Sequence, residues 1–443
     1  GVIVQLGGQT PLNLAEGLEQ AGLNILGTST ESIDFAEDRK KFRELLNRLD
    51  TKQPTSEIAF TAEEARLMAQ KVGYPVLIRP SYVLGGRAME IVYDEAQLKK
   101  YIRYAVEASD RAPILIDRFL EDAIEVDVDL IVDGHDFVVG GVLEHIEEAG
   151  VHSGDAAMSL PPFSLSESLV SDLIQKTKQL AKGLNIVGLM NVQYAIQKGE
   201  IYCLEVNPRA SRTVPFVSKA IGTPLAKLAA KVMVGKTLKE LGFAKEVVPS
   251  YFSIKESVFP FVKFPGVDII LSPEMKSTGE VMGIDEDFGL AYYKSQQAAY
   301  SEIPPAGGNV FLSVKSADKE KVVRVAKGLS ALGYHIVSTK GTNAHLAKHG
   351  IGTEAINKLG DGSPHIGDRI RAKDIQLIIN TPTGKGPMLD EAKIRSLAVS
   401  FRIPCITTIN AAQALIAGIE SFRRKGLSVK TVQEYLKKEK THV

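Results

Sequence analysis

Two strand-like segments flank a tight turn at residues 198–200, with Met190-Asn191-Val192-Gln193-Tyr194 before the turn and Leu204-Glu205-Val206-Asn207-Pro208-Arg209-Ala210-Ser211-Arg212 after it. A two-residue loop would pair Gln193 with Leu204 and place Glu205 on the opposite face. A three-residue loop over 198–200, with its glycine at positive φ, pairs Gln193 with Glu205 instead. Since only the second register brings Gln193, Glu205 and Asn207 to one face, we expect the three-residue loop.

The predicted hairpin offers the ligands that a magnesium ion prefers. One carboxylate and two amides supply hard oxygen atoms, and Mg²⁺ usually binds such groups together with substrate phosphates and water. Arg209 and Arg212 follow directly after the second strand, where they can meet an anionic group. A plainer interpretation is an exposed polar strand face ahead of a proline. The apolar residues Val192, Leu204 and Val206 between these polar groups argue against it.

The composition is that of an ordinary globular protein with no dominant charge. The 443 residues weigh 48.0 kDa, 44% of them are hydrophobic, and 53 Lys and Arg balance 53 Asp and Glu. The length suggests two or three domains. Because the charges cancel, no overall field draws the chain to nucleic acid or to an anionic membrane, and we expect neither as a partner.

Three features of the sequence indicate where the protein is located and whether the chain is a fragment. Cys203 and Cys405 are the only cysteines, which excludes a disulfide scaffold and fits a reducing cytoplasm. No apolar run approaches the roughly 18 residues that span a bilayer. The chain opens without methionine on Gly1-Val2-Ile3-Val4-Gln5-Leu6-Gly7-Gly8, which reads as a buried strand running into a glycine turn. We therefore expect a cytoplasmic protein fragment whose upstream part is missing.

The predicted elements alternate between strands and helices. Before a Pro/Gly linker at 303–308 we expect strands at the chain start and at 24–27, 74–79 and 125–133, and helices at 11–21, 32–49 and 61–72. After it we expect strands at 310–314, 335–338, 375–379 and 405–408, and helices at 319–332, 390–401 and 411–422. The second region therefore has the pattern of a doubly wound α/β sheet.

A glycine loop follows the strand that ends at Arg79. It reads Arg79-Pro80-Ser81-Tyr82-Val83-Leu84-Gly85-Gly86-Arg87-Ala88-Met89. Paired glycines let backbone N–H groups turn toward a phosphate, and guanidinium groups add bidentate donors. A hairpin turn with exposed arginines explains the same residues equally well, and no Gly-Lys-Ser/Thr sequence closes the loop as in a P-loop.

A second glycine-containing stretch, from Glu144 to Asp155, carries His145 and His152. Neither a cysteine nor a helical His-Glu-x-x-His pattern accompanies these histidines, so a zinc site is disfavoured. The glycines at 150 and 154 are better explained by a close approach of the backbone to a ligand.

Taken together, three stretches are very similar to the large chain of carbamoyl-phosphate synthetase. They are the Arg79 loop continued to Glu90, Gly150-Val151-His152-Ser153-Gly154-Asp155, and Glu205-Val206-Asn207-Pro208-Arg209-Ala210-Ser211-Arg212-Thr213-Val214-Pro215-Phe216. The resemblance runs through essentially all 443 residues. It implies the second synthetase half, with an α/β and α+β fold in three parts. These parts are a pre-ATP-grasp remnant over 1–34, an ATP-grasp domain over 35–303, and a doubly wound, methylglyoxal-synthase-like allosteric domain over 306–443.

The resemblance also implies roles for individual residues. ATP would be bound by Arg39, Arg79, Arg118, Leu120, Glu125, Gly150, Val151, His152, Ser153, Gln193 and Glu205. Mg²⁺ or Mn²⁺ would be held by Gln193, Glu205 and Asn207. Arg209 and Arg212 would face the carbamate and the transferring phosphoryl group as catalytic residues. An effector nucleotide such as UMP or IMP would contact Lys319, Thr339, Thr342, Lys358 and Asn380.

The implied reaction needs no nucleophilic side chain. An oxygen of carbamate attacks the γ-phosphate of ATP in line, which gives carbamoyl phosphate and ADP. Carbamate is unstable in water, and the glycine loop around 85–87 is a predicted lid that would keep water out. The implied partners are the first synthetase half of the same large chain and a glutaminase small chain, within an oligomer that serves arginine and pyrimidine synthesis.

Two other functions stay open on the sequence. A different ATP-grasp ligase, such as a relative of biotin carboxylase, is disfavoured by the Arg79 loop and by the terminal domain. Alternatively, the chain only binds nucleotide and effector, because its missing upstream part leaves it inactive. Formation of carbamoyl phosphate by the isolated chain distinguishes catalysis from binding alone.

Overall fold

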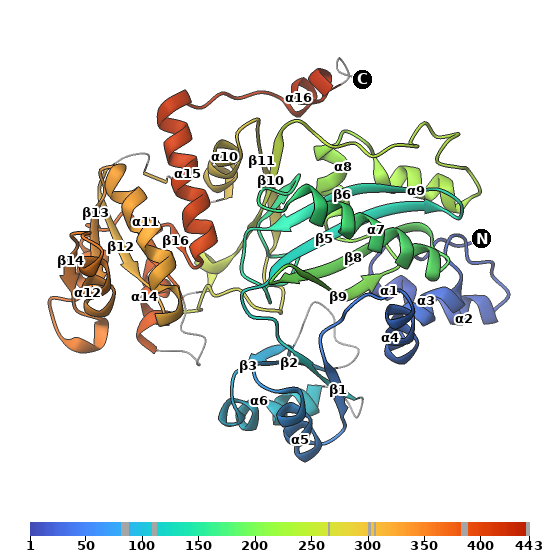
Figure 1. Cartoon of the computed structure of the whole chain (residues 1–443), viewed down its shortest axis with the longest axis horizontal. Coiled ribbons are helices and arrows are strands. Elements are labelled where there is room, and N and C mark those ends of the chain that lie inside the picture. Colours follow the sequence, from blue (N-terminus) through green and yellow to red (C-terminus); the bar gives the residue numbers. More distant parts are fainter. Residues whose placement is uncertain are drawn as a thin grey trace. The chain divides into compact units, whose positions relative to one another are not determined.

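The computed structural model describes residues 1–80, 88–108, 113–264, 266–299, 303–304, 307–381 and 389–439. The chain forms two compact units, whose elements are labelled in Figure 1. Unit 1 comprises Gly1–Gly154, Met158–Ser250 and Lys430–Val443, and unit 2 comprises Asp155–Ala157 and Tyr251–Val429. The units group residues 251–303 with the C-terminal region and not with the expected ATP-grasp domain, so the domain bounds stay a prediction.

The first 50 residues of unit 1 form four short helices, α1 Gln9–Leu12, α2 Ala15–Gln20, α3 Thr30–Glu37 and α4 Arg39–Arg48. The two strands predicted here are reduced to one parallel bridge between Val2 and Ile25, and the helix predicted over 11–21 is split in two. The helix predicted over 32–49 is interrupted at Asp38. Because the Asp38 side chain accepts hydrogen bonds from the backbone N–H groups of Lys40 and Lys41, it caps a new helix there.

A four-stranded antiparallel sheet follows, with the strand order β1-β4-β2-β3. Its elements are β1 Ser56–Ala59, α5 Ala62–Val72, β2 Val76–Pro80, β3 Glu90–Val92, α6 Glu95–Ala108 and β4 Ile114–Arg118, which share one apolar core. The predictions of a helix over 61–72 and a strand over 74–79 are confirmed. Thr61 caps the start of α5, and Gly73 ends it at a φ of 85°. The predicted lid around 85–87 lies outside the described residues.

The larger sheet of unit 1 carries the strands of the predicted site (Figure 1). Within this unit the strands run in the antiparallel order β7-β6-β5-β8-β9, with the bounds β5 Ile124–Asp133, β6 Phe137–His145, β7 Met158–Leu160, β8 Val187–Gln197 and β9 Glu200–Asn207. Val126, Val128 and Leu130 of β5 pack into the main apolar core with α4 and with α7 Glu167–Gly183. Since side chains alternate along a strand, residues 125, 127 and 129 point to the other face. Three more helices belong to unit 1, α8 Val214–Ala220, α9 Leu225–Met233 and α16 Val432–Glu439.

Unit 2 begins with two antiparallel strands, β10 Phe252–Val258 and β11 Gly279–Asp285, with the 3-10 helix η1 Phe261–Lys263 between them. The next helix, α10 Phe288–Ala299, crosses α15 Ile409–Lys425 at a glycine in each helix. A Cβ atom added to Gly289 would lie 2.7 Å from the backbone carbonyl carbon of Ala417, and one added to Gly418 would lie 2.7 Å from the oxygen of Gly289. This close helix contact explains why residues 251–303 belong to the same compact unit as the C-terminal region.

The rest of unit 2 is a parallel sheet with the strand order β14-β13-β12-β15-β16. Its elements are β12 Asn309–Ser313, η2 Ser316–Asp318, α11 Lys319–Ala331, β13 His335–Thr339, α12 Lys340–Lys348, β14 Glu354–Ile356, η3 Leu359–Asp361, α13 Ile366–Arg371, β15 Leu377–Asn380, α14 Leu389–Ser400 and β16 Cys405–Ile406. The chain moves outward from β12 to β14 and then returns to the other side of β12, which is the reversal of a doubly wound sheet. The predicted doubly wound fold is confirmed. Across the described residues, no helix has both the length and the apolar character needed to cross a bilayer.

Candidate active site

The hairpin of β8 and β9 has the predicted register. Gln193 pairs with Glu205, and Asn191 pairs with Asn207. Residues that pair directly across antiparallel strands point to the same face. Gln193, Glu205 and Asn207 therefore share one face, as the sequence predicted, and Asn191 joins them.

The predicted three-residue loop, by contrast, is wrong. Strand pairing continues as far as Gln197 and Glu200, which leaves a loop of two residues, Lys198 and Gly199. Their φ angles are 54° and 81°. Two positive φ angles are typical of the type I′ turn that suits a right-handed hairpin twist. A β-bulge further along then corrects the register, since Tyr194 pairs with Cys203 and Leu204 becomes the extra residue. The bulge, not the loop, sets the register of the site.

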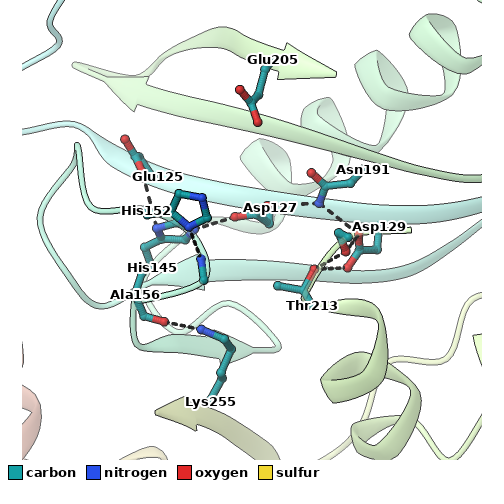
Figure 2. A network of polar contacts seen from close by, with 12 residues as sticks. Glu125, Asp127, Asp129, His145, His152, Ala156, Asn191, Glu205, Thr213 and Lys255 are labelled. Carbon is teal, nitrogen blue, oxygen red and sulfur yellow. Dashed lines mark hydrogen bonds and ion pairs between the residues drawn. The ribbon is translucent and has the colours of Figure 1, made fainter. Parts of the chain in front are cut away.

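Strand β5 adds three carboxylates to the same face of the sheet (Figure 2). Asp127 pairs with Gln193, Asp129 pairs with Asn191, and Glu125 precedes them at the same two-residue spacing. All three carboxylate residues are buried. Because the alternate residues of β5 lie in the apolar core, the strand cannot turn this polar face elsewhere without exposing that core.

His145 of β6 lies between two of these carboxylates. Its Nε2 atom is 2.7 Å from Asp127 Oδ2, and its Nδ1 atom is 3.5 Å from Glu125 Oε2. The backbone N–H of Gly150 donates a hydrogen bond of 2.9 Å to Glu125 Oε1. Burial raises the pKa of Glu125 to about 7, against the effect of the imidazole and of that N–H group. The carboxylates of Asp127 and Glu205 reinforce the rise, and a cation bound near this face would oppose it.

Asp129 holds the segment that follows β9. Its Oδ1 atom accepts hydrogen bonds from Asn191 Nδ2 at 3.0 Å and from Ser211 Oγ at 2.7 Å, and its Oδ2 atom accepts one from Thr213 Oγ1. Burial raises the pKa of Asp129 to about 6, although the two hydroxyl groups oppose that rise. The residues 208–213, which include both predicted catalytic arginines, are thereby fixed beside the carboxylate face.

The two arginines of that segment differ in their surroundings. Arg209 donates from Nη2 to Asn207 Oδ1 at 3.0 Å and from Nη1 to the carbonyl oxygen of Ala210 at 3.1 Å. Burial lowers the pKa of Arg209, and its Nε atom is buried without a hydrogen-bond partner among the described residues. Arg212 is exposed. The first arginine is thus oriented by the hairpin, whereas the second is accessible from solvent.

Two further predicted arginines lie near Glu205. Arg79 places its Nε atom 3.0 Å from Asp117 Oδ2 and its Nη1 atom 3.7 Å from Glu205 Oε2. Loss of hydration, followed by repulsion from Arg79, lowers the pKa of Arg39 to about 10, while Asp117 and Glu205 oppose that decrease. Arg39 and Arg79 therefore share one electrostatic environment, as expected of residues that contact the same phosphate chain.

Two further residues predicted to bind ATP, Arg118 and Leu120, have different surroundings. Arg118 donates from Nη1 to the carbonyl oxygens of Gly73 and Tyr74 at 2.6 and 2.5 Å, which ties it to the backbone ahead of β2. Leu120 is buried in a small apolar cluster with Ala195, the strand partner of Glu125. In this structure Arg118 therefore supports the backbone, whereas Leu120 lies close to the predicted site.

The loop over 150–153 approaches the site through its backbone. Gly150 has a φ of 91°, and a Cβ atom added there would lie 2.7 Å from Ile91 Cδ1, so only glycine fits. Val151 is buried, while His152 and Ser153 are half-buried. His152 Nδ1 accepts a hydrogen bond of 2.9 Å from the backbone N–H of Gly154. The backbone of Gly150 contacts Glu125 of the carboxylate face, and the predicted approach of this loop to a ligand stays a prediction.

The hairpin residues fit a hard divalent cation. Glu205 has a side chain that is 45% exposed, and its Oε1 atom accepts a hydrogen bond of 3.0 Å from Asn207 Nδ2. Gln193 is half-buried opposite Glu205. The Asn207 amide oxygen already accepts from Arg209, which leaves it one lone pair for a metal. Together these groups offer one carboxylate and two amide oxygens, the donors that suit Mg²⁺.

Several residues of the site were not assigned any role from the sequence. Asp127, Asp129, His145 and Asn191 form the buried polar network just described. The alternation of acidic and apolar residues along β5 was the available signal, because buried acidic residues need partners. Gln5 gave no local signal: it donates from Nε2 to the carbonyl oxygen of Pro208 at 2.8 Å, a contact 203 residues distant in the chain.

A second polar cluster lies in unit 2, where β12, β13 and β15 end. Thr339 Oγ1 lies 3.2 Å from Ser313 Oγ and 3.3 Å from Thr342 Oγ1, which accepts from the backbone N–H of Val314 at 3.4 Å. Asn380 Nδ2 donates to the carbonyl oxygen of Ser313 at 3.1 Å. The structure thus brings together three of the five predicted effector residues.

The two predicted effector lysines are placed differently. Lys319 begins α11, and its Nζ atom lies 3.8 Å from the position of a Cβ atom on Gly341, at the start of α12. Lys358 precedes η3, where its backbone N–H donates to Asp361 Oδ2 at 3.3 Å. Lys319 therefore reaches the edge of the threonine cluster, whereas the described contact of Lys358 is within its own turn.

Fold and site together define an ATP-grasp protein that carries a methylglyoxal-synthase-like region. Residues 38–241 match the family described as carbamoyl-phosphate synthase L chain, ATP binding domain, and residues 321–407 match the MGS-like domain. Among solved structures, the chain is similar to biotin carboxylase of Campylobacter jejuni in complex with an ATP analogue, with a TM-score of 0.52, 17% identity and coverage of 64% of this chain and 72% of that one. The ADP complex of N5-carboxyaminoimidazole ribonucleotide synthetase gives a TM-score of 0.53 at 15% identity, with coverage of 67% and 79%.

The chain belongs to the carbamoyl phosphate synthase large-chain family. It is 52% identical over 455 residues to the C-terminal section of the large chain of Aquifex aeolicus, which covers 98% of this chain and 84% of that relative. It is 55% identical over 436 residues to the large chain of Archaeoglobus fulgidus. In that comparison 98% of this chain covers only 40% of the relative. The likeness to biotin carboxylase is one of fold alone.

Proposed function

We propose that this chain phosphorylates carbamate with ATP to give carbamoyl phosphate, as the second synthetase half of a carbamoyl phosphate synthase large chain. The observation that carries the proposal is the register of β8 and β9, which sets Glu205 opposite Gln193 beside the buried carboxylates of β5. The similarity to a C-terminal section supports the assignment to the second half. The product would serve arginine and pyrimidine synthesis.

The proposed cofactors are ATP and Mg²⁺, or Mn²⁺ in its place. Gln193, Glu205 and Asn207 would hold the metal, whose positive charge would offset the charge of the triphosphate. Arg39 and Arg79 would contact the phosphates, because both interact electrostatically with Glu205, the proposed metal ligand that would lie beside the triphosphate. Leu120, Glu125 and the loop over 150–153 would line the rest of the nucleotide site. Arg118 would join them only after giving up a backbone contact.

The proposed reaction depends on position and charge. A carbamate oxygen attacks the γ-phosphorus, the bond from that phosphorus to the ADP oxygen breaks, and the electron pair leaves with ADP. Arg209, held by Asn207, and the exposed Arg212 would stabilise the charge that develops on the transferred group. Carbamate is already an anion, so no side chain has to act as a general base. Asp129 acts as a positioning residue because it fixes the segment that carries both arginines.

The reverse reaction tests this proposal without handling carbamate. The full chain, incubated with MgADP and carbamoyl phosphate, is expected to form ATP, measured by a luciferase assay. Equilibrium binding of ADP is measured in the same preparation. ADP binding without ATP formation would contradict catalysis by this chain and would favour the binding-only alternative.

We also propose that the threonine cluster of unit 2 binds the phosphate of an effector nucleotide such as UMP or IMP. The match to the MGS-like domain and the reversal of strand order next to β12 support this site, since open α/β sheets bind ligands at such a position. Thr339, Thr342 and Asn380 would shape the phosphate site with Lys319. Lys358 would contribute only if η3 moves toward them.

Replacing Thr342 with alanine is expected to weaken effector binding by about 5-fold, since one hydroxyl bond contributes roughly 1 kcal/mol. The Thr342 hydroxyl connects the start of α12 to the backbone after β12, so its loss loosens the phosphate site. Calorimetric titration with UMP and with IMP measures the change. Thr353→Ala is the matched control, because its hydroxyl contacts Ser338 and Asn343 elsewhere in the unit. Equal affinity in Thr342→Ala and wild type would remove this cluster from the proposed site.

The remaining proposals concern the whole enzyme. The partners would be the first synthetase half of the same large chain and a glutaminase small chain, in an oligomer. The location would be cytoplasmic. Co-purification of this chain with a separately expressed first half tests the first partner, and failure of the two to associate would contradict it.

A further inference from the structure

Two histidines and a glutamate that belong to neither proposed site gather on two neighbouring helices of unit 2. His345 and His349 lie on α12, and Glu320 lies in the first turn of α11. One candidate ligand atom from each residue lies within 4.8 Å of the others. The fold causes this meeting: β12, β13 and β14 are consecutive parallel neighbours, so the right-handed connections place α11 and α12 on the same side of the sheet.

The spacing of the histidines puts both rings on one face of α12. Residues four apart are neighbours on a helix, and the two ring centroids are 4.8 Å apart. His349 Nδ1 lies 3.3 Å from the carbonyl oxygen of His345 and, when protonated, donates a hydrogen bond to it. That bond selects the tautomer in which Nε2 of His349 carries the free lone pair. The Nε2 atom lies 3.8 Å from Glu320 Oε2.

His345 has a nitrogen atom with no hydrogen bond. Its side chain is only 16% exposed, and its Nε2 atom is buried without a hydrogen-bond partner among the described residues. That atom lies 3.5 Å from Glu320 Oε1. A buried polar atom without a partner is costly, and a bound cation would satisfy it. Two imidazole nitrogens and one carboxylate therefore converge on a common point.

We propose that Glu320, His345 and His349 bind one divalent transition-metal ion, with Zn²⁺ as the best candidate. Two imidazoles and one carboxylate suit Zn²⁺, Co²⁺, Ni²⁺ or Cu²⁺, whereas Mg²⁺ prefers oxygen ligands alone. Tetrahedral Zn²⁺ with bonds of about 2.0–2.1 Å needs ligand atoms roughly 3.4 Å apart. The two imidazoles lie 3.5 and 3.8 Å from different oxygens of Glu320, and the three ligand atoms lie within 4.8 Å of one another. Metal binding therefore requires the ligand atoms to move closer together, which the 79% exposed side chain of Glu320 allows. The fourth position would take water.

The bound ion would join the helices that begin at the proposed effector site. Glu320 follows Lys319 directly, and α12 carries Thr342 in its first turn. The metal site itself does not depend on the proposed catalytic or effector functions. It uses other residues, and its test reads metal binding alone.

The test is a titration of the full chain with Co²⁺, after chelator treatment and in the presence of excess Mg²⁺ to fill sites made of oxygen ligands. Wild type is expected to bind one Co²⁺ with the visible absorption bands of a tetrahedral complex, and Zn²⁺ should displace it. His349→Ala and Glu320→Gln should each weaken this binding at least about 10-fold. Both side chains are at least one-third exposed, so their replacement is not expected to unfold the chain.

His335→Ala serves as the matched control. His335 is an exposed histidine of unit 2 whose Nε2 atom lies 2.8 Å from Glu354 Oε2. It does not belong to the cluster of Glu320, His345 and His349. Its replacement should leave the Co²⁺ spectrum unchanged. Thermal unfolding provides a second readout: Zn²⁺ should raise the melting temperature of wild type and of His335→Ala, but not of His349→Ala. Co²⁺ binding that is equal in wild type, His349→Ala and Glu320→Gln, or absent in wild type, would overturn the proposal.

Discussion

Glu205→Gln is expected to lower ATP formation from MgADP and carbamoyl phosphate by at least about 100-fold, while the variant stays folded. Glu205 supplies the only carboxylate of the proposed metal ligands, and glutamine keeps its shape but removes its charge. The hydrogen bond from Asn207 to Oε1 can survive in glutamine, so the hairpin itself should not change. The luciferase assay over a range of Mg²⁺ concentrations measures both the rate and the metal requirement.

Glu200→Gln is the matched control for that experiment. Glu200 begins the same strand, is exposed, and forms an ion pair with Lys52 at 2.6 Å. Exposed ion pairs contribute little to stability, so this variant should keep the wild-type rate within about 2-fold. A near-normal rate of Glu205→Gln at saturating Mg²⁺ would remove Glu205 from the metal site. Equal losses in both variants would point to damage to the hairpin instead.

The sequence predicted the elements that depend on local patterns. The helix over 61–72 has a capping threonine and a terminal glycine, and both signals lie within the helix or next to it. The doubly wound region was predicted because its strands are apolar and separated by helices of ordinary length. The strands expected at the chain start and at 24–27 are not formed, since one bridge from Val2 to Ile25 is the only strand pairing that these described residues make.

In the site, too, the features set by local sequence patterns were predictable and those set by tertiary contacts were not. The alternation of acidic and apolar residues in the strand predicted over 125–133 is enough to place Glu125, Asp127 and Asp129 on one face, since alternation is a local property of a strand. The register of Gln193 and Glu205 was predicted correctly for the wrong reason, because a bulge depends on packing across the sheet and leaves no local signal. The buried network around Asp129 required the meeting of three separate strand and loop segments, which no local pattern encodes.

Asp129→Ala is expected to destabilise unit 1 by about 2–4 kcal/mol, because it leaves several buried donors without an acceptor. Asn191 and Ser211 donate to one oxygen of Asp129, and Thr213 donates to the other. The segment with Arg209 and Arg212 would lose its attachment to β5, so we also expect the maximal rate of ATP formation to fall more than about 10-fold. Urea unfolding measures the free energy, and kcat and KM are compared well below the unfolding midpoint.

Asp129→Asn tests whether the hydrogen bonds of this side chain or its negative charge hold the segment over 208–213. Asparagine keeps one acceptor oxygen for Asn191 and Ser211, and its amide can donate to the Thr213 hydroxyl, so most of the stability and of the maximal rate should return. It also resembles the protonated carboxyl, which the raised pKa of Asp129, about 6, makes accessible in mildly acidic solution. Ser211→Ala removes one of the three donors to Asp129 together with the acceptor of the Val214 N–H, and should cost about 1–2 kcal/mol, less than Asp129→Ala. If Asp129→Ala unfolds at the same urea concentration as wild type, the carboxylate does not hold this segment, and other contacts, such as those of Gln5 and Asn207, position it instead.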